Sequence, residues 1–229
     1  MKAAALVALL WAAPAAAEGI VAASFGDPTS RYPHGVLGDL IEWGSLRMET
    51  VAGAEVTITL PESRVFEDTA PRLADVDQDG NAEVVVIESD ARQGARLSVY
   101  DASGLIASND FIGRSFRWLA PVAIADLDGD GQVELAYVDR PHLAKTLRVF
   151  RYQPGKLEER ARFAGVTNHR IGEADIAGGL RLCGNGPEMI VANAAWTRLL
   201  ALQFDGTDIT ATDIGPHIGR SSFAEALAC

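Results

Sequence analysis

The stretch that decides the fold is Asp126-Leu127-Asp128-Gly129-Asp130-Gly131-Gln132-Val133-Glu134, in which oxygen-bearing side chains stand at alternate positions. A second copy, Asp75-Val76-Asp77-Gln78-Asp79-Gly80-Asn81-Ala82-Glu83, precedes it in register, at an interval of 51 residues (75 to 126). Neighbouring carboxylates repel one another, whereas Ca²⁺ takes about six to eight oxygen ligands from short loops of this kind. The two stretches therefore predict a repeated cation-binding loop.

An EF-hand loop begins in the same way but ends differently. It requires a bidentate Glu at position 12 and a helix on either side. Here position 12 is Val86 in the first copy and Tyr137 in the second, because the acidic residue comes earlier. The residues that follow, 84–87 and 135–138, are apolar, β-branched or aromatic, as in buried strands. The sequence therefore predicts loops between strands and excludes an EF-hand.

Each loop offers the same set of oxygen ligands. We expect four carboxylates and one backbone carbonyl from each loop: Asp75, Asp77, Asp79 and Glu83 with the carbonyl of Asn81, and Asp126, Asp128, Asp130 and Glu134 with that of Gln132. Ca²⁺ is favoured over Mg²⁺, which gives up its water reluctantly to an all-protein cage. We predict two structural ions, because catalytic metals keep an open coordination position. The alternative is a pair of ordinary Asp-Gly turns.

The loop sequences also resemble a known family. Ala-Asp-Val-Asp-Gln-Asp-Gly at 74–80 and Ala-Asp-Leu-Asp-Gly-Asp-Gly at 125–131 are similar to the calcium loops of FG-GAP or VCBS repeats. The resemblance covers residues 66–152 well and the rest more weakly. It implies the β-propeller of the integrin α N-terminal domain and of many bacterial exported proteins, in which each repeat is a four-stranded blade. Neither copy has an intact Phe-Gly…Gly-Ala-Pro signature, of which only Ala-Pro remains at 70–71 and 120–121.

The chain divides into units that keep this spacing, at about residues 30–61, 66–112, 116–163 and 168–214. Periods of roughly 20–50 residues are typical of propellers and arrays. We therefore predict an all-β fold, a small β-propeller of about four four-stranded blades. Closure of the ring is left open: residues 18–25 or the tail after Ile214 supply a sealing strand, the sheets form an open stack, or a second chain completes the ring.

Strand positions follow from the apolar runs of each unit. The two clear units predict strands at 72–75, 83–89, 96–100 and 105–112, and at 118–126, 134–139, 146–152 and 157–163. In the first unit, residues 32–39 resemble the lead-in and inner strand, and Glu55–Leu60 alternates like a half-buried strand. In the fourth unit we expect an inner strand at Ile171–Ile176. Both units lack the acidic loop, so we expect no calcium in either.

The start of the chain has the form of a signal peptide, residues 1–17. Lys2 gives it a positive beginning, an apolar run follows, and Ala15-Ala16-Ala17 fits a small-residue cleavage site. The apolar run is shorter than the roughly 18 residues of a membrane span. We therefore expect a single domain at 18–229, located in the periplasm or secreted.

The net charge restricts the class of partner. The formal charge is −11 at pH 7, which argues against non-specific binding to nucleic acid or to an anionic membrane surface. An acidic chain suits the binding of divalent cations, although solubility alone explains it equally well.

Cys183 and Cys229 are the only cysteines. In an exported chain, two cysteines predict a disulfide, which here would tie the chain end to the altered loop of the fourth unit. The alternative, a reactive thiol, has no neighbouring His pattern to support it.

The chain carries no G-x-S-x-G, no H-E-x-x-H and no glycine-rich phosphate loop, and its four histidines are scattered singly. We therefore predict a calcium-binding module that binds or scaffolds an unknown protein, glycan or anionic ligand. The alternative is a propeller enzyme, a hydrolase or lyase, that uses a His/Arg/Asp patch.

That patch is expected on the face opposite the calcium loops, where segments enter the inner strands around the central channel. Its residues are Tyr32, His34, Asp68, Arg72, Arg117, Trp118, Arg140, His142, Asn168, His169 and Arg170. Arg side chains suit carboxylate and phosphate groups, which favours an anionic or glycan-like ligand. In the alternative interpretation, the basic residues pair with Asp68, Asp139 and Glu173 and close a narrow channel.

Overall fold

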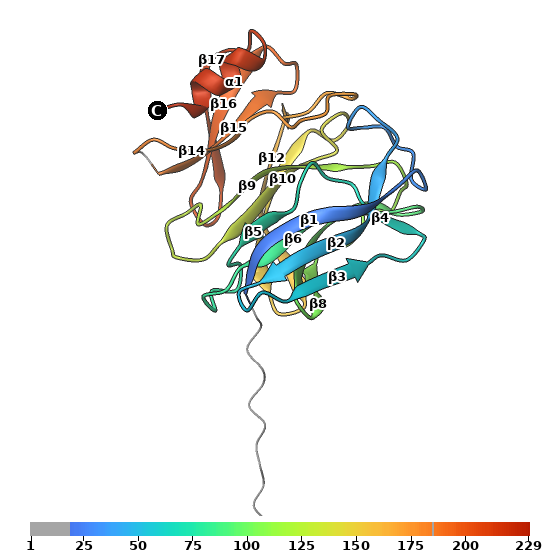
Figure 1. Ribbon diagram of the computed structural model, residues 1–229. Helices are drawn as coiled ribbons and strands as arrows, with labels where there is room; N and C mark the ends of the chain where they lie inside the picture. Colours follow the sequence, from blue (N-terminus) through green and yellow to red (C-terminus); the bar gives the residue numbers. More distant parts are fainter. Residues whose placement is uncertain (1–18, 185) are drawn as a thin grey trace, which may run out of the picture.

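The computed structural model describes residues 19–184 and 186–229 (Figure 1). The fold is all-β, with three antiparallel sheets and one short helix near the chain end, α1 (Arg220–Leu227). The expected signal peptide lies outside the described residues. No helix within these ranges is long and apolar enough to cross a membrane.

The first sheet runs in the order β1-β2-β4-β6-β7-β8, with β3 beside β2 and β5 beside β6. Its strands are β1 (Ile20–Thr29), β2 (Glu42–Thr50), β3 (Glu55–Thr59), β4 (Arg64–Phe66), β5 (Arg72–Ala74), β6 (Glu83–Asp90), β7 (Gly94–Asp101) and β8 (Gly104–Ser108). The expected strand at 105–112 is therefore shorter, and the alternating segment at 55–60 forms β3. The predicted strands at 72–75, 83–89 and 96–100 are confirmed within a few residues.

The second sheet is a plain four-stranded meander, β12-β11-β10-β9. Its strands are β9 (Leu119–Ala125), β10 (Glu134–Asp139), β11 (Thr146–Gln153) and β12 (Lys156–Ala164), which confirms the four strands predicted for this repeat. The third sheet runs β13-β15-β16-β17, with β14 also paired to β15. Its strands are β13 (Val166–Thr167), β14 (Gly179–Leu182), β15 (Pro187–Asn193), β16 (Arg198–Phe204) and β17 (Ile209–Pro216).

The apolar runs after the two acidic loops form the most buried strands. Every residue of β6 and of β10 is buried, as expected for strands covered on both faces. Val85 and Ile87 pack with Leu135, Tyr137 and Trp118 in one core cluster between the first and second sheets. A second cluster lies between the second and third sheets. The acidic loops thus lead directly into the most buried strands of the fold.

Two predicted inner strands are wrong. Residues 32–39 form bends and turns, and the first sheet begins instead with β1, whose partner is β2. Ile171–Ile176 is also irregular, and Ile171 is 71% exposed. The reason is that one edge of β15 is covered in two pieces, by β13 at 192–193 and by β14 at 187–190. Residues 168–178 form an excursion between these pieces.

The sheets are also fewer than the four four-stranded blades expected, and none closes on itself. The short strand β4 joins what the sequence divides into a first and a second unit. Its Phe66 pairs with Trp43 of β2, and its Arg64 pairs with Asp90 of β6. These few backbone hydrogen bonds make one sheet out of two repeats.

The disulfide between Cys183 and Cys229 is present, with an S–S distance of 2.00 Å and a sequence separation of 46. It attaches the chain end to the segment after β14. Arg181 strengthens the attachment by donating to the carbonyl of Ala226 at 2.8 Å. The helix α1 contributes the buried Phe223 to a core cluster of the third sheet.

Candidate functional site

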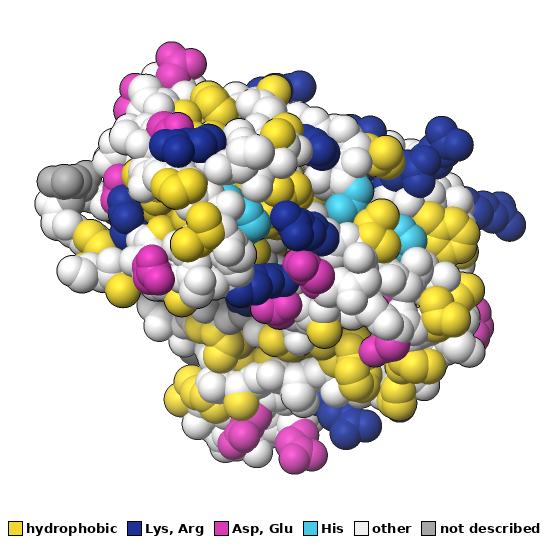
Figure 2. All heavy atoms as spheres, turned by 90° about the horizontal axis from the view of Figure 1, so that it is seen from above, with side chains coloured by type: hydrophobic (Ala, Val, Ile, Leu, Met, Phe, Trp, Pro, Cys, Tyr) yellow, Lys and Arg dark blue, Asp and Glu magenta, His cyan; other side chains and the backbone are white. Residues whose placement is uncertain are grey.

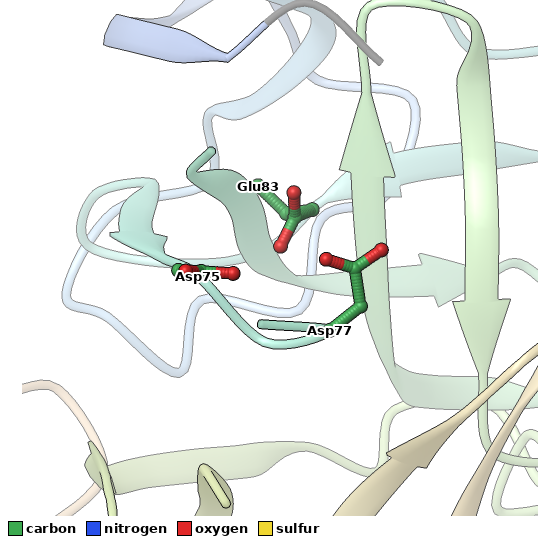
Figure 3. A group of neighbouring side chains, drawn as sticks. All are labelled: Asp75, Asp77 and Glu83. Atoms are coloured by element: carbon green, nitrogen blue, oxygen red, sulfur yellow. The ribbon is translucent and has the colours of Figure 1, made fainter. Parts of the chain in front are cut away.

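Two acidic loops occupy equivalent places in the first and second sheets. Loop 1 (residues 75–83) connects β5 to β6, and loop 2 (residues 126–134) connects β9 to β10. In loop 1, Asp75 follows the end of β5 and Glu83 begins β6, and with Asp77 they turn their carboxylates toward one another (Figure 3). The carboxylate oxygens of these three residues lie within 4.8 Å of one another, as do those of Asp126, Asp128 and Glu134 in loop 2.

The two loops share one set of hydrogen bonds. The buried glutamate closes each loop: Glu83 accepts from the backbone N–H of Val76 and Glu134 from that of Leu127, each at 2.8 Å. The first aspartate of each loop accepts a hydrogen bond from the N–H of the glycine five residues later. Gly80 donates to Asp75 at 3.1 Å, and Gly131 donates to Asp126 at 3.0 Å. Asp79 and Asp130 likewise accept from the N–H two residues on. The sequence repeat is therefore also a repeat of backbone geometry.

Loop 1 has the features of a cation site. Asp75 Oδ1 is buried and has no hydrogen-bond partner among the described residues, which is costly unless a ligand fills the gap. Glu83 is 1% exposed; its burial, followed by the charges of the neighbouring aspartates, raises its pKa to about 7. Burial and the charge of Asp79 also raise the pKa of Asp77. These carboxylate oxygens are hard donors that repel one another in the absence of a cation, and Ca²⁺ prefers such ligands.

The loops contact one another as well. The Gln78 side chain of loop 1 donates a hydrogen bond to the carbonyl of Gly131 in loop 2. Of the ligands expected in each loop, the structure brings three carboxylates together. Asp79 and Asp130 lie outside these groups, and their Oδ1 atoms bond the backbone of Asn81 and Gln132.

Loop 2 is contacted by a residue that the loop sequences do not reveal. Arg151 of β11 is 7% exposed, pairs with Glu134 across the sheet, and directs its guanidinium at the loop carboxylates. It donates to Glu134 Oε1 at 2.6 Å, to Asp130 Oδ2 at 2.9 Å and to Asp128 Oδ2 at 3.0 Å. The alignment of residues 97–100 with 147–150 contains the signal, because it sets Asp101 and Arg151 at the same position.

A family model described as an FG-GAP-like repeat matches residues 75–137 of the chain, from the first aspartate of loop 1 into β10. The chain therefore contains an FG-GAP-like repeat at these residues. A comparison with curated proteins found no match. The family and the antiparallel sheets support a β-propeller-like fold, and the match spans both acidic loops of this FG-GAP-repeat protein.

At the other end of β9 and β10 lies a group of histidines and aromatic residues. Glu134 pairs with Ala125 at the loop end, and Asp139 pairs with Leu119 at the opposite end. A hollow of about 30 Å³ there is lined by His34, Phe116, Arg117, Trp118, Arg140, Pro141, His142 and Leu143. Figure 2 shows a face on which His side chains lie between basic and hydrophobic ones. The predicted patch is thus partly assembled.

His34 is held by a buried carboxylate. Its Nδ1 hydrogen-bonds Glu67, whose other oxygen accepts from the hydroxyl of Ser89. Glu67 is fully buried, and burial raises its pKa, although the contact with His34 opposes that rise. Trp118 donates its indole N–H to the carbonyl of Glu67 at 2.7 Å. Glu67 and Ser89 were not among the predicted site residues, because nothing in the sequence links either of them to His34.

His142 and His169 form a second chain of hydrogen bonds. The carbonyl of Glu173 can only accept, so His169 carries its proton on Nε2, at 2.8 Å from that oxygen. Burial lowers the pKa of both imidazoles, that of His142 to about 4. In the neutral pair, His142 Nε2 therefore donates to His169 Nδ1 at 3.1 Å. Nδ1 of His142 is left as an unprotonated nitrogen.

Most of the remaining residues of the predicted patch make ion pairs, ring contacts or hydrogen bonds within the protein. Arg72 makes an ion pair with Asp68 at 2.7 Å, and Arg140 makes one with Asp139 at 2.8 Å. Arg170 lies over the ring of Trp196, 4.5 Å from its centroid. The hydroxyl oxygen of Tyr32 accepts a hydrogen bond from the backbone N–H of Phe116. The side-chain amide of Asn168 donates to the carbonyls of residues 120 and 121. Arg117 has no carboxylate partner in the described ranges.

Proposed function

We propose that this FG-GAP-repeat protein is a calcium-dependent binding module, in which calcium fixes the loops and the histidine end of the sheets receives a ligand. The observation that carries the proposal is loop 1, where three convergent carboxylates and the partnerless oxygen of Asp75 form an oxygen cage. Its residues would hold Ca²⁺, which supplies positive charge to carboxylates that otherwise repel. Both acidic groups can hold a metal ion.

The proposed ligand is anionic or glycan-like. Arg117 supports this choice, because its guanidinium donates to the carbonyl of its own neighbour Phe116 and makes no ion pair among the described residues. It lines the hollow together with His34 and His142. An Arg fork matches carboxylate and phosphate groups. The pairing of Arg72 and Arg140 with aspartates means that the binding surface is smaller than the predicted patch.

We also propose that the chain is exported and has four blades. The paired cysteines suit an oxidising compartment, such as the periplasm or the outside of a cell. Counting four blades treats the first sheet as two repeats joined by β4. The β3 strand then belongs to the first repeat, and β5 is the inner strand of the second.

An acid–base enzyme is the second candidate function. It is favoured by the contact between His34 and the buried Glu67, because a carboxylate that orients an imidazole is a common arrangement for a general base. The hollow beside it has room for one or two water molecules. The hydroxyl that contacts Glu67, Ser89, is fully buried, so it has no access to a substrate. The binding module therefore remains the stronger proposal.

The proposed function is tested by calcium titration in a calorimeter, together with thermal unfolding in calcium and in chelator. Calcium should raise the melting temperature of the wild-type chain, since a ligand at 100 times its dissociation constant stabilises by about 2.7 kcal/mol. Asp75→Asn should remove most of this rise, and Asp213→Asn, which removes a surface carboxylate paired with Arg198, should keep it. A wild-type chain that neither binds calcium nor gains stability from it would refute the proposal.

The ligand face is tested separately on an array of acidic glycans and phosphorylated compounds. Arg117→Ala should lower the affinity for any ligand found there. Arg47→Ala, which removes an exposed charge on β2, should leave that affinity unchanged. Equal affinities for wild type and Arg117→Ala would show that the ligand binds elsewhere.

A further inference from the structure

Each acidic loop lies beside a neighbouring strand, and the residue that this strand places next to the loop differs in charge between the two repeats. In the second sheet, β10 and β11 pair Glu134 with Arg151. In the first sheet, β6 and β7 pair Val84 with Tyr100, so that the next residue of β7, Asp101, follows at the register position beside Glu83. Asp101 is 8% exposed, and its charge is one of the causes that raise the pKa of Asp77. Loops of matching sequence therefore lie in different electrostatic surroundings.

The carboxylates of loop 2 already have a positive partner on the neighbouring strand β11. The guanidinium of Arg151 makes ion pairs with Asp128, Asp130 and Glu134. Both carboxylate oxygens of Asp126 accept backbone hydrogen bonds, from Gly129 at 2.7 Å and Gly131 at 3.0 Å. The polar atoms that an ion would bind are thus satisfied within the chain.

The carboxylates of loop 1 differ from those of loop 2 in their ion pairs. None of its four carboxylates, nor Asp101, makes an ion pair with any residue in the described ranges. The only buried oxygen of either loop that lacks a hydrogen-bond partner, among the residues described, is Oδ1 of Asp75. The hydrogen bonds accepted by Asp101 all go to its Oδ1, from the backbone and hydroxyl of Ser103 and the N–H of Gly104. Five carboxylates here therefore have no positive partner among the described residues.

We propose that Arg151 is the built-in cation of loop 2, so that the chain binds one Ca²⁺ tightly at loop 1 and a second only weakly at loop 2. A calcium ion at loop 2 must displace the guanidinium from three carboxylates. The displaced group would then lose its partners in a buried position, which is strongly unfavourable. At loop 1 the ion meets no competitor, and Asp101 adds negative charge. This inference rests on the proposed calcium-dependent function and assigns the two loops unequal calcium affinities.

Calorimetric titration of the full chain with CaCl₂ tests the inference, with Arg151→Gln as the main variant and Arg151→Lys as its matched control. The wild-type chain should show one tight site and a second that is at least about tenfold weaker. Arg151→Gln removes the competing charge, so the second site should tighten at least about tenfold. Arg151→Lys keeps a positive charge and should leave the second site weak.

A second measurement does not depend on replacing Arg151. In Asp75→Asn, loop 1 is disabled and the remaining calcium affinity is that of loop 2, which should be as weak as the second wild-type site. Tight binding by Asp75→Asn would overturn the inference, as would two wild-type sites of equal affinity that Arg151→Gln does not change. In both of these cases the proposed function would stand. A wild-type chain that binds no calcium at all would refute both proposals.

Discussion

Replacing Glu83 with Gln should stabilise the calcium-free protein, although it removes a calcium ligand. A buried carboxyl with a raised pKa binds a proton in the folded state that the unfolded state releases, so the free energy of unfolding falls as pH rises from about 4.5 to about 7. Each pKa unit corresponds to about 1.4 kcal/mol. At pH 8 the folded protein therefore carries a cost of about 3 kcal/mol, which Glu83→Gln removes while its amide oxygen still accepts from Val76.

The assay is thermal or urea unfolding at pH 5 and pH 8, in chelator and in calcium. In chelator at pH 8, Glu83→Gln should unfold about 6–12 °C above wild type, at roughly 2–4 °C per kcal/mol for a chain of this size; at pH 5 the gain should nearly vanish. In saturating calcium at pH 8 the order should reverse, because only wild type keeps the full ligand set.

Glu134→Gln is the matched control for this prediction. In chelator it should destabilise the protein, because it takes a carboxylate from the buried guanidinium of Arg151. A Glu83→Gln protein less stable than wild type in chelator at pH 8 would refute the reasoning. So would equal changes in stability from the two substitutions.

Three further predictions concern the scaffold. Cys229→Ser should lower the free energy of unfolding by about 4 kcal/mol, from the loop that the bond to Cys183 closes; a denaturant midpoint like that of wild type would contradict this. Gly178→Ala should destabilise severely, because its Cβ would lie 2.0 Å from the carbonyl oxygen of Ile190 at a φ of +77°, and a melting curve like that of wild type would refute the steric reasoning. Glu42 is buried with its pKa raised to about 9, so the folded state loses stability as pH rises from about 4.5 to 9. At about 1.4 kcal/mol per pH unit, Glu42→Gln should be more stable by roughly 5 kcal/mol at pH 8. A stability difference in urea unfolding that does not widen between pH 6 and pH 8 would exclude this cause.

The sequence predicts those parts of the fold that depend on local pattern. The acidic loops and the apolar strands after them, β6 and β10, are encoded in consecutive residues, and so are the four strands of the second sheet. The failures have a different origin. Residues 171–176 carry the apolar pattern of an inner strand, but the edge of β15 is taken by β13 and β14. That competition is decided by tertiary packing and not by the segment itself.

The candidate site divides in the same way. The three convergent carboxylates of each loop follow from their spacing, whereas the contact of Arg151 with loop 2 crosses between strands and appears only when the repeats are aligned along their whole length. The contact between His34 and Glu67 has no counterpart in the other repeats. No repeat pattern predicts it, because it depends on the irregular course of residues 32–39.

The short strand β4 limits how a protein of this kind can change in length. Repeat proteins gain and lose copies by duplication and deletion when each copy carries its own edges. Here β4 pairs with strands of two copies at once, through Phe66 with β2 and through Arg64 with β6. A cut between the first and second repeats therefore removes the β4 pairing from either β2 or β6. We therefore expect removal of one of the first two repeats to cost more stability than a cut after β8 or β12, where no strand is shared between sheets.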